Sequence, residues 1–375
     1  MSGKLRVGIV YGGRSGEHQV SLATAFSVLS NFDYNKYEIV PFYITKSGEW
    51  RTGGLLLEPP KSQQQLLLAE QELLSQETAV AAILNRSAEI SQADGGASSS
   101  KAKALDVFFP LLHGTFGEDG TIQGLFEMAG IPYVGAGVLA SAVGMDKLVM
   151  KKLFAQEGLP QCIFRGFTRT EWEKRQTFYI LEIETALGYP CFVKPANLGS
   201  SVGVSKAKNR EELIEAVQNA FRYDRKVVVE EFVDAREIEV SVLGNEEPIA
   251  SVPGEIVSSN DFYDYKAKYI DGKSSMIIPA ELTPEQTEQV RELALRAFKA
   301  IDGSGLCRAD FFLRRQDGAI LINEVNTMPG FTPYSMYPLL WKESGKPYRE
   351  LLDDLIRLAI ERFEAKQRLE YSFEL

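Results

Sequence analysis

The sequence has few of the residues that mark metal–thiolate sites or nucleic-acid surfaces. It contains only two histidines and three cysteines (Cys162, Cys191 and Cys307), at spacings that fit no zinc site. An odd number of scattered cysteines in a long chain indicates reduced thiols, so we expect a cytoplasmic protein. Acidic residues (51) outnumber basic residues (41), and the formal net charge is −10. Because the protein has no excess of basic residues to neutralise a phosphate backbone, the composition argues against nucleic acid as the main partner. A nucleotide needs only a few local cations.

Three sequence signatures are also missing. No apolar stretch reaches the length of a membrane span, so we expect no membrane partner. The P-loop pattern G-x-x-x-x-G-K-[S/T] does not occur, and the glycines of residues 12–16 do not form the dinucleotide pattern G-x-G-x-x-G. If the protein binds a nucleotide, it therefore does so by another arrangement.

The length and the first elements predict a multidomain α/β protein. A chain of 375 residues with 45% hydrophobic residues is expected to fold as two or three domains. Its start reads as a strand, a glycine turn, a helix and a second strand, which indicates a parallel sheet. These four elements are predicted over residues 5–11, 12–16, 20–29 and 37–44. After them we predict a helix over 63–84, a mobile loop over 93–100 and a buried strand over 105–112.

The rest of the chain alternates strands, helices and one long polar loop. Residues 258–275 lack helical or strand periodicity and are rich in Tyr, Asp and Lys, which predicts a functional lid or a disordered segment. The helix that begins at Lys147 is expected to end at Gly158, with Pro160 beyond it. Strands are predicted over 191–195, 227–233 and 237–243, a Gly/Ser loop over 197–204, and helices over 284–301 and 348–363.

The most informative polar residues lie near residue 324. The apolar run 319–322 predicts a strand with Glu324 and Asn326 at its end, on one face. Asp310 precedes a second predicted strand, 311–313. Two carboxylates and an amide suit Mg²⁺ held by few protein groups and completed by phosphate oxygens and water. The alternative is a hairpin with solvated polar ends.

Lysine and small residues form a possible phosphate cradle. Lys194 ends a predicted strand and is followed by Gly199, Ser200 and Ser201, whose backbone N–H groups could face a phosphate. A simple Gly/Ser hairpin would have the same sequence. Glu230 and Glu237 flank a short turn, where they would bind ribose hydroxyls or an adenine amine, or else be solvated.

Two further residues follow strands of the first domain. His113 begins a loop rich in glycine and acidic residues after a buried strand, where α/β proteins usually have their sites. The alternative is a polar histidine at the surface. Glu17 follows the first glycine turn, where a carboxylate either caps the next helix or binds a substrate ammonium.

Taken together and in order, these motifs resemble the D-alanine–D-alanine ligases, ATP-grasp enzymes of peptidoglycan synthesis. The resemblance spans nearly the whole chain except about residues 60–103. The matching motifs are Gly12 to Leu22, His113 to Thr121, Met145-Asp146-Lys147, Lys194-Pro195 with Gly199 to Gly203, Glu230 to Glu237, Tyr263 to Tyr269, Arg308 with Asp310, and Asn323 to Gly330.

The resemblance implies a fold and a division into domains. The fold class is α/β, with an N-terminal parallel-sheet (pre-ATP-grasp) domain followed by a two-lobed ATP-grasp. The implied ranges are 1–146 for the first domain with a flexible insertion at about 60–103, 147–234 for the small lobe, and 235–375 for the large lobe with its lid at about 258–275.

The resemblance also implies a role for each matching residue. Asp310, Glu324 and Asn326 would bind two Mg²⁺ ions, with Mn²⁺ as an alternative. Arg308 and the Gly330 N–H would surround the oxyanion, and Ser335 would lie near the second alanine. Glu17, Ser200 and Tyr269 would form a hydrogen-bond chain at the first D-alanine, beside His113. ATP would be bound by Lys147, Lys194, Ser201, Glu230, Glu237, Lys268 and Asn323.

The implied reaction is ATP-dependent ligation of two D-alanine molecules through a D-alanyl phosphate, in a cytoplasmic homodimer. The alternatives are a ligase of the same family that uses D-lactate or D-serine as second substrate, and a non-catalytic ATP-binding module. The tyrosine-containing lid favours D-alanine, and the intact metal set argues against the non-catalytic module.

Overall fold

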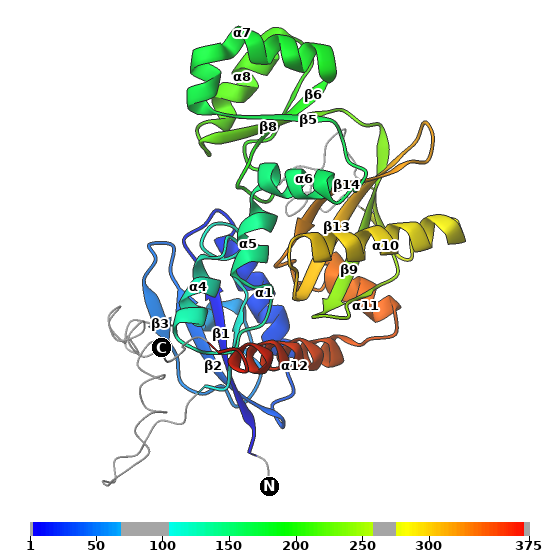
Figure 1. Cartoon of the computed structure of the whole chain (residues 1–375). Helices are drawn as coiled ribbons and strands as arrows, with labels where there is room; N and C mark the ends of the chain where they lie inside the picture. Colours follow the sequence, from blue (N-terminus) through cyan, green and yellow to red (C-terminus); the bar gives the residue numbers. More distant parts are fainter. Residues whose placement is uncertain (1–2, 69–104, 258–274, 371–375) are drawn as a thin grey trace.

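A computed structural model describes residues 3–68, 105–257 and 275–370. Over these residues the strands form three sheets, each built from one part of the chain (Figure 1). The strand orders are β3-β2-β1-β4, β5-β8-β6-β7 and β12-β11-β9-β13-β14, with β10 beside β9. The strands of each sheet fall within one of the three ranges expected above, whereas the domain boundaries themselves stay a prediction.

The N-terminal sheet has the parallel pairing that the sequence predicts. β1 (Leu5–Gly12) lies between β2 (Tyr37–Ile44) and β4 (Val107–Pro110) and is parallel to both, and β3 (Trp50–Thr52) adds an antiparallel edge. Helix α1 (His18–Asn31) packs on this sheet, because one of its faces is apolar or small and buried. β4 is shorter than predicted. The short helices nearby are η1 (Gln63–Leu67), α4 (Thr121–Met128) and α5 (Val138–Met145).

The second sheet is antiparallel and is covered on one face by two helices at the top of Figure 1. Alternate apolar residues such as Val193 and Val229 pack under these helices with Phe167. Asn209 caps the second helix by accepting a hydrogen bond from the Glu212 N–H at 2.9 Å. The elements are β5 (Phe164–Thr168), α7 (Arg169–Ala186), β6 (Cys191–Pro195), β7 (Ser205–Ala207), α8 (Arg210–Ala220) and β8 (Lys226–Glu231).

The third sheet carries helices on both faces. Ile238, Val240 and Phe311 face the apolar side of α10, whereas Leu243 and Leu306 pack on the opposite side with α11. Its elements are β9 (Ala235–Gly244), β10 (Ile249–Ala250), β11 (Gly254–Val257), β12 (Ser275–Ile277), α10 (Pro284–Ala300), β13 (Gly305–Arg314), β14 (Ile320–Asn326) and α11 (Met336–Glu343).

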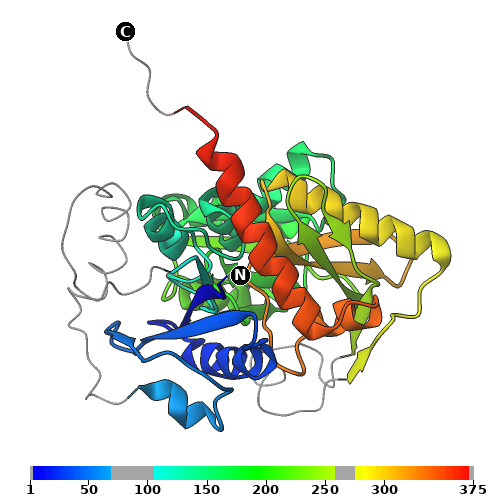
Figure 2. The same cartoon turned by 90° about the horizontal axis from the view of Figure 1, so that it is seen from below.

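Two helices connect the sheets. The last helix, α12 (Tyr348–Gln367), runs between the N-terminal and third sheets, and its Leu351 and Leu355 share one core with Val7 and Ile9 (Figure 2). Helix α6 (Lys147–Gln156) lies between the second and third sheets, where Phe154 is buried in the core of the third. The chain segments that meet at α6 are therefore held by packing on both sides.

The structure corrects one expectation about strand ends and confirms another. Asp310 lies in the middle of β13, because the apolar residues from Gly305 onward already pair with β9. Glu324 and Asn326 are among the last residues of β14, which ends at Asn326, so they lie at the strand end as predicted. They do share the less buried face, as alternation predicts.

Some expectations fall partly or wholly outside the described residues. Of the helix predicted over 63–84, residues 63–67 form a 3₁₀ turn and residues from 69 onward are outside. The predicted loop 93–100 and residues 258–274 of the lid are outside as well. In the described parts of the chain, none of the helices combines the length and the apolar composition that a membrane span requires.

Candidate active site

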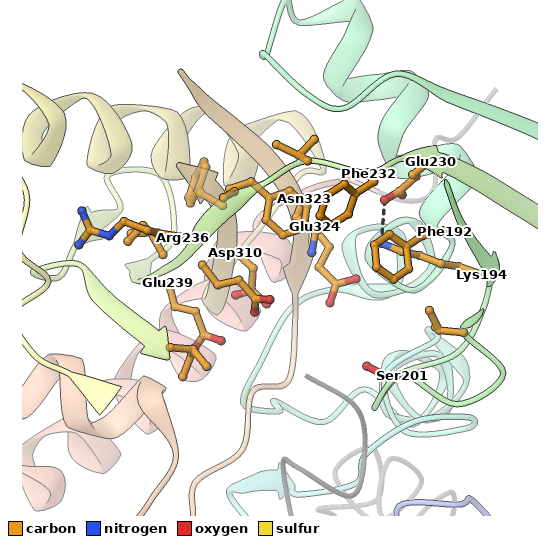
Figure 3. A pocket seen from close by; sticks show the side chains of 18 of the residues that line it. Phe192, Lys194, Ser201, Glu230, Phe232, Arg236, Glu239, Asp310, Asn323 and Glu324 are labelled. Carbon is orange, nitrogen blue, oxygen red and sulfur yellow. Dashed lines mark hydrogen bonds and ion pairs between the residues drawn. The ribbon is translucent and has the colours of Figure 1, made fainter. Parts of the chain in front are cut away.

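A cavity of about 550 Å³ opens between the second and third sheets (Figure 3). One side is lined by lysine residues and the serine loop, and the other side by carboxylates of the third sheet. The cavity therefore presents opposite charges on facing walls. The predicted site residues that line it are Lys147, Lys194, Ser200, Ser201, Glu230, Glu237, Asp310, Asn323 and Glu324.

The acidic wall is formed by cross-strand neighbours. Asp310 of β13 pairs in register with Glu324 of β14. Arg308 donates to both oxygens of Asp310 at 2.7 Å and forms an ion pair with Glu239 at 3.0 Å between Nε and Oε2. Lys147 Nζ lies 3.0 Å from Glu324 Oε2. The third sheet and α6 thus bring carboxylates and cations together as ion pairs at a largely half-buried place.

These residues fit the predicted magnesium site. Within the described residues, no three His, Cys, Asp or Glu side chains are grouped as a metal cage. Two facing carboxylates and an amide match an ion whose remaining ligands are phosphate oxygens and water. Asn326 Oδ1 accepts from the Met328 N–H at 3.1 Å and keeps a second lone pair. The buried Asn323 Oδ1, which lines the cavity, has no hydrogen-bond partner in the described structure.

The basic wall contains a buried ionic triad. Glu230 accepts a hydrogen bond from Lys194 Nζ at 2.7 Å (Figure 3), and its other oxygen lies 3.1 Å from Lys151 Nζ. Burial raises the pKa of the Glu230 carboxyl, but the two lysines outweigh burial and lower it to about 2. Burial also lowers the pKa of Lys194, and Glu230 reverses this, so that the net pKa is raised. The Glu230 carboxyl and the Lys194 ammonium are therefore both charged at neutral pH.

The serine loop between β6 and β7 contacts the start of α1. Ser200 and Ser201 have φ values of 50° and 57°, a left-handed conformation that is uncommon outside glycine and occurs often at ligand sites. Lys147 Nζ donates to the Leu198 carbonyl at 3.0 Å, which fixes the loop to helix α6. The loop confirms the Gly/Ser connection predicted from the sequence.

Glu17 does not cap its helix. It occupies the N-cap position of α1 without a side-chain capping bond, and its carboxylate instead accepts a hydrogen bond from the Ser200 hydroxyl. A Cβ at Gly114 would lie 2.7 Å from Glu17 Oε2, and a Cβ at Gly199 would lie 3.1 Å from it. A side chain at either position would crowd this carboxylate, and Gly114 also has a φ of 73°, a backbone conformation that favours glycine. The bonding of Glu17 to a loop far away in sequence favours the ligand interpretation over the cap.

His113 connects the first domain to the loop after β14. Its Nδ1 lies 3.1 Å from the Met328 carbonyl oxygen, and its Nε2 lies 3.0 Å from Thr24 Oγ1. Glu118 Oε1 is 3.7 Å from Nδ1. Burial lowers the pKa of His113, but Glu118 outweighs it and the net pKa is raised. The buried imidazole thus holds the Met328–Gly330 turn against the first domain.

The turn after β14 brings two more predicted residues together. A Cβ at Gly330 would lie 2.8 Å from Ser335 Oγ, so a larger residue would displace the serine. Ser335 Oγ accepts a hydrogen bond from the Thr332 N–H at 3.0 Å. The remaining two predicted residues, Lys268 and Tyr269, lie outside the described residues.

Sequence reasoning missed several residues of this site. Phe192 and Phe232 line the cavity with ring centroids 6.2 Å apart, and Lys206 Nζ lies 4.2 Å from the Phe232 centroid. Lys151 and Glu239 were missed as well. Alternation within a strand could have indicated Glu239, which shares a strand face with Glu237, whereas the other residues carry no sequence signal.

Two family models match most of the chain. The model of the D-ala D-ala ligase N-terminus matches residues 6–136, and the model of the D-ala D-ala ligase C-terminus matches residues 153–357. The chain belongs to the D-alanine–D-alanine ligase family. Its fold is accordingly the ATP-grasp of that family, as the sequence resemblance implied.

Individual relatives agree with the family models. A D-alanine–D-alanine ligase of Bacillus licheniformis is 56% identical over 370 residues, which cover 99% of this chain and 100% of the relative. One of Geobacillus thermodenitrificans is 54% identical over 371 residues, 99% of this chain and 100% of the relative.

Solved structures of the family are also similar. The VanG D-Ala:D-Ser ligase of Enterococcus faecalis has a TM-score of 0.78 at 35% identity, with coverage of 95% of this chain and 100% of the other. The D-alanine–D-alanine ligase of Coxiella burnetii has a TM-score of 0.77 at 32% identity, with coverage of 97% and 96%.

Proposed function

We propose that this chain joins two D-alanine molecules with ATP to form D-alanyl-D-alanine, a peptidoglycan precursor, and that the cavity beside α6 is where it does so. Membership of the family and the relatives at more than 50% identity support the reaction. The observation that carries the location is the pairing of a lysine wall with a carboxylate wall, with Glu17 and Ser200 joined at the edge.

The phosphates of ATP would lie between the two walls. Lys147, Lys194 and the Ser201 loop would bind them, and Lys268 of the lid would reach the γ-phosphate. Phe192 and Phe232 offer an apolar wall for adenine, while Glu230 and Glu237 would bind its amine and the ribose. Asn323 would complete the nucleotide site.

Asp310, Glu324 and Asn326 would hold the divalent ions, which we propose to be two Mg²⁺ with Mn²⁺ as an alternative. When bound, such ions neutralise charge on the transferring phosphoryl group. The protein's own part is to hold the carboxylates in place, since Arg308 fixes Asp310 and Lys147 contacts Glu324.

The first D-alanine would bind where three parts of the chain meet. Glu17 would take its ammonium, with Ser200 and Tyr269 in the same hydrogen-bond chain and His113 holding the adjoining turn. Its carboxylate would be phosphorylated, because a free carboxylate does not react with an amine in water. Arg308 and the Gly330 N–H would then stabilise the oxyanion that forms when the second D-alanine, near Ser335, attacks the acyl carbon.

The remaining proposals rest on the family resemblance. We propose domain boundaries at 1–146, 147–234 and 235–375, a lid at about 258–275 that excludes water from the acyl phosphate, and a cytoplasmic homodimer. The competing proposal is D-lactate or D-serine as second substrate. The similarity to the VanG D-Ala:D-Ser ligase is the observation that supports D-serine.

Phosphate release from ATP tests the activity and the second substrate together. With Mg²⁺, we expect release to depend on D-alanine and to yield D-alanyl-D-alanine in equal amount. L-Alanine is the control and should give no release. D-Serine or D-lactate added to D-alanine should form little mixed product. A predominance of mixed product would assign the chain to the competing specificity, and release that is independent of D-alanine would refute the ligase activity.

A further inference from the structure

Lys151 is a buried lysine that faces the candidate site without lining its cavity. Its side chain is 1% exposed, and its ammonium lies 3.1 Å from Glu230 Oε1. It also donates to the Asn323 carbonyl oxygen at 3.3 Å, so it contacts both β8 and β14. Unpaired buried ammonium groups are strongly disfavoured, which accounts for the ion pair. The roles proposed above leave Lys151 without a function.

Lys151, Glu230 and Lys194 together carry two positive charges and one negative charge. Glu230 shares its two oxygens between the lysines, one oxygen to each. Lys194 lines the cavity, whereas Lys151 is enclosed behind Glu230. The surplus positive charge of the triad is thus available on the cavity side, where a phosphate would compensate it.

The two lysines have different freedom to move. Lys151 lies one helical turn after Lys147 on α6, with Phe164 5.8 Å from its ammonium at the ring centroid. The Gln161 side chain also donates to the Lys151 carbonyl at 2.8 Å. Lys194 ends a strand beside the open cavity. If Lys194 turns to a phosphate, Glu230 keeps a charged partner only through Lys151.

We propose that Lys151 is a positioning residue: as the permanent counter-ion of Glu230, it leaves the Lys194 ammonium available for a phosphate of ATP. The inference rests on the proposed phosphate role of Lys194. Without Lys151, Lys194 would be the sole partner of a buried carboxylate, and moving it to a phosphate would leave that carboxylate uncompensated. The cost would appear in binding of the phosphates and not in binding of the nucleoside.

The test compares binding of ATP and adenosine by calorimetry, with Mg²⁺ present and D-alanine absent. The quantity measured is the ratio of the adenosine Kd to the ATP Kd, which reports the contribution of the phosphates. Lys151→Met is expected to lower this ratio at least tenfold. Lys152→Met, the matched control on the exposed side of the same helix, should leave it unchanged. If Lys151 had only a structural role, Lys151→Met would lower thermal stability and leave the ratio unchanged.

Lys194→Met separates failure of this inference from failure of the proposed function. It should lower the same ratio, and an unchanged ratio would refute the phosphate role of Lys194. If Lys194→Met lowers the ratio and Lys151→Met does not, the positioning role alone is wrong.

A second pair of variants keeps the test valid if Lys151→Met does not fold. Glu230→Gln and the double variant Glu230→Gln/Lys151→Met leave no buried carboxylate that lacks a partner, and in the single variant Lys151 still donates to the Asn323 carbonyl oxygen. Because Lys151 is proposed to act only through the Glu230 charge, both should have the same ratio. A further drop of the ratio in the double variant would overturn the proposal.

Discussion

Replacing Glu324 by glutamine is expected to lower turnover at least about a thousandfold, the effect of losing roughly 4 kcal/mol of transition-state stabilisation. The substitution keeps the shape of the side chain and removes the charge that faces Asp310 across the two strands. It also leaves Lys147 without the carboxylate that now lies 3.0 Å from its ammonium. Dipeptide formation under saturating ATP, Mg²⁺ and D-alanine measures the loss, and circular dichroism checks that the fold is retained.

Asp317→Asn is the matched control for Glu324→Gln. Asp317 lies in the turn between β13 and β14, and its side chain is 49% exposed and paired with Arg314. Removing a charge from the same hairpin, away from the cavity, should leave turnover near the original value because exposed ion pairs contribute little. Near-normal turnover of Glu324→Gln would refute its assignment as a metal ligand.

Replacing Arg308 by lysine is expected to lower kcat about 10²- to 10³-fold, with a smaller change in KM for ATP. Arg308 holds Asp310 through two parallel hydrogen bonds and also contacts Glu239. A lysine ammonium keeps the charge but cannot reproduce this planar fork. Asp310 should therefore be held less firmly, and the oxyanion should be less stabilised. Steady-state kinetics with varied ATP and D-alanine separates the effect on kcat from the effect on KM.

Arg314→Lys provides the comparison on the same strand. Arg314 makes a similar paired contact with Asp317 outside the cavity, so its replacement should leave kcat almost unchanged. If Arg308→Lys keeps its kcat within a few-fold of the original, the guanidinium does not contribute to the transition state and the proposed oxyanion role is wrong.

Local sequence patterns were sufficient to predict much of this fold. Apolar runs identified β1, β2 and β6 almost to the residue, since buried strands need continuous apolar side chains. Patterning was less reliable at strand ends, where pairing with a neighbour extends the strand. Asp310 shows this, because ten residues of β13 pair with β9 although the sequence indicated only the last apolar run.

The site itself could be predicted only in part, because its contacts join distant segments. The acidic set on β13 and β14 was visible as a motif. Lys147 comes close to Glu324 only through the packing of α6, and the Glu17–Ser200 hydrogen bond joins the start of α1 to the loop between β6 and β7. No sequence pattern indicates that Lys151 is buried, because a lysine in a helix normally faces solvent. Only the tertiary structure shows its burial.

Oxygen transfer from substrate to phosphate tests the central claim most directly. D-Alanine labelled with ¹⁸O in its carboxylate is incubated with the protein, ATP and Mg²⁺, and the released phosphate is analysed by mass spectrometry. If the carboxylate attacks the γ-phosphorus and the amine of the second D-alanine then displaces phosphate from the acyl carbon, one labelled oxygen leaves with each phosphate. We expect one ¹⁸O in each phosphate and one in the new peptide carbonyl. Phosphate released together with dipeptide but without label would contradict activation through an acyl phosphate.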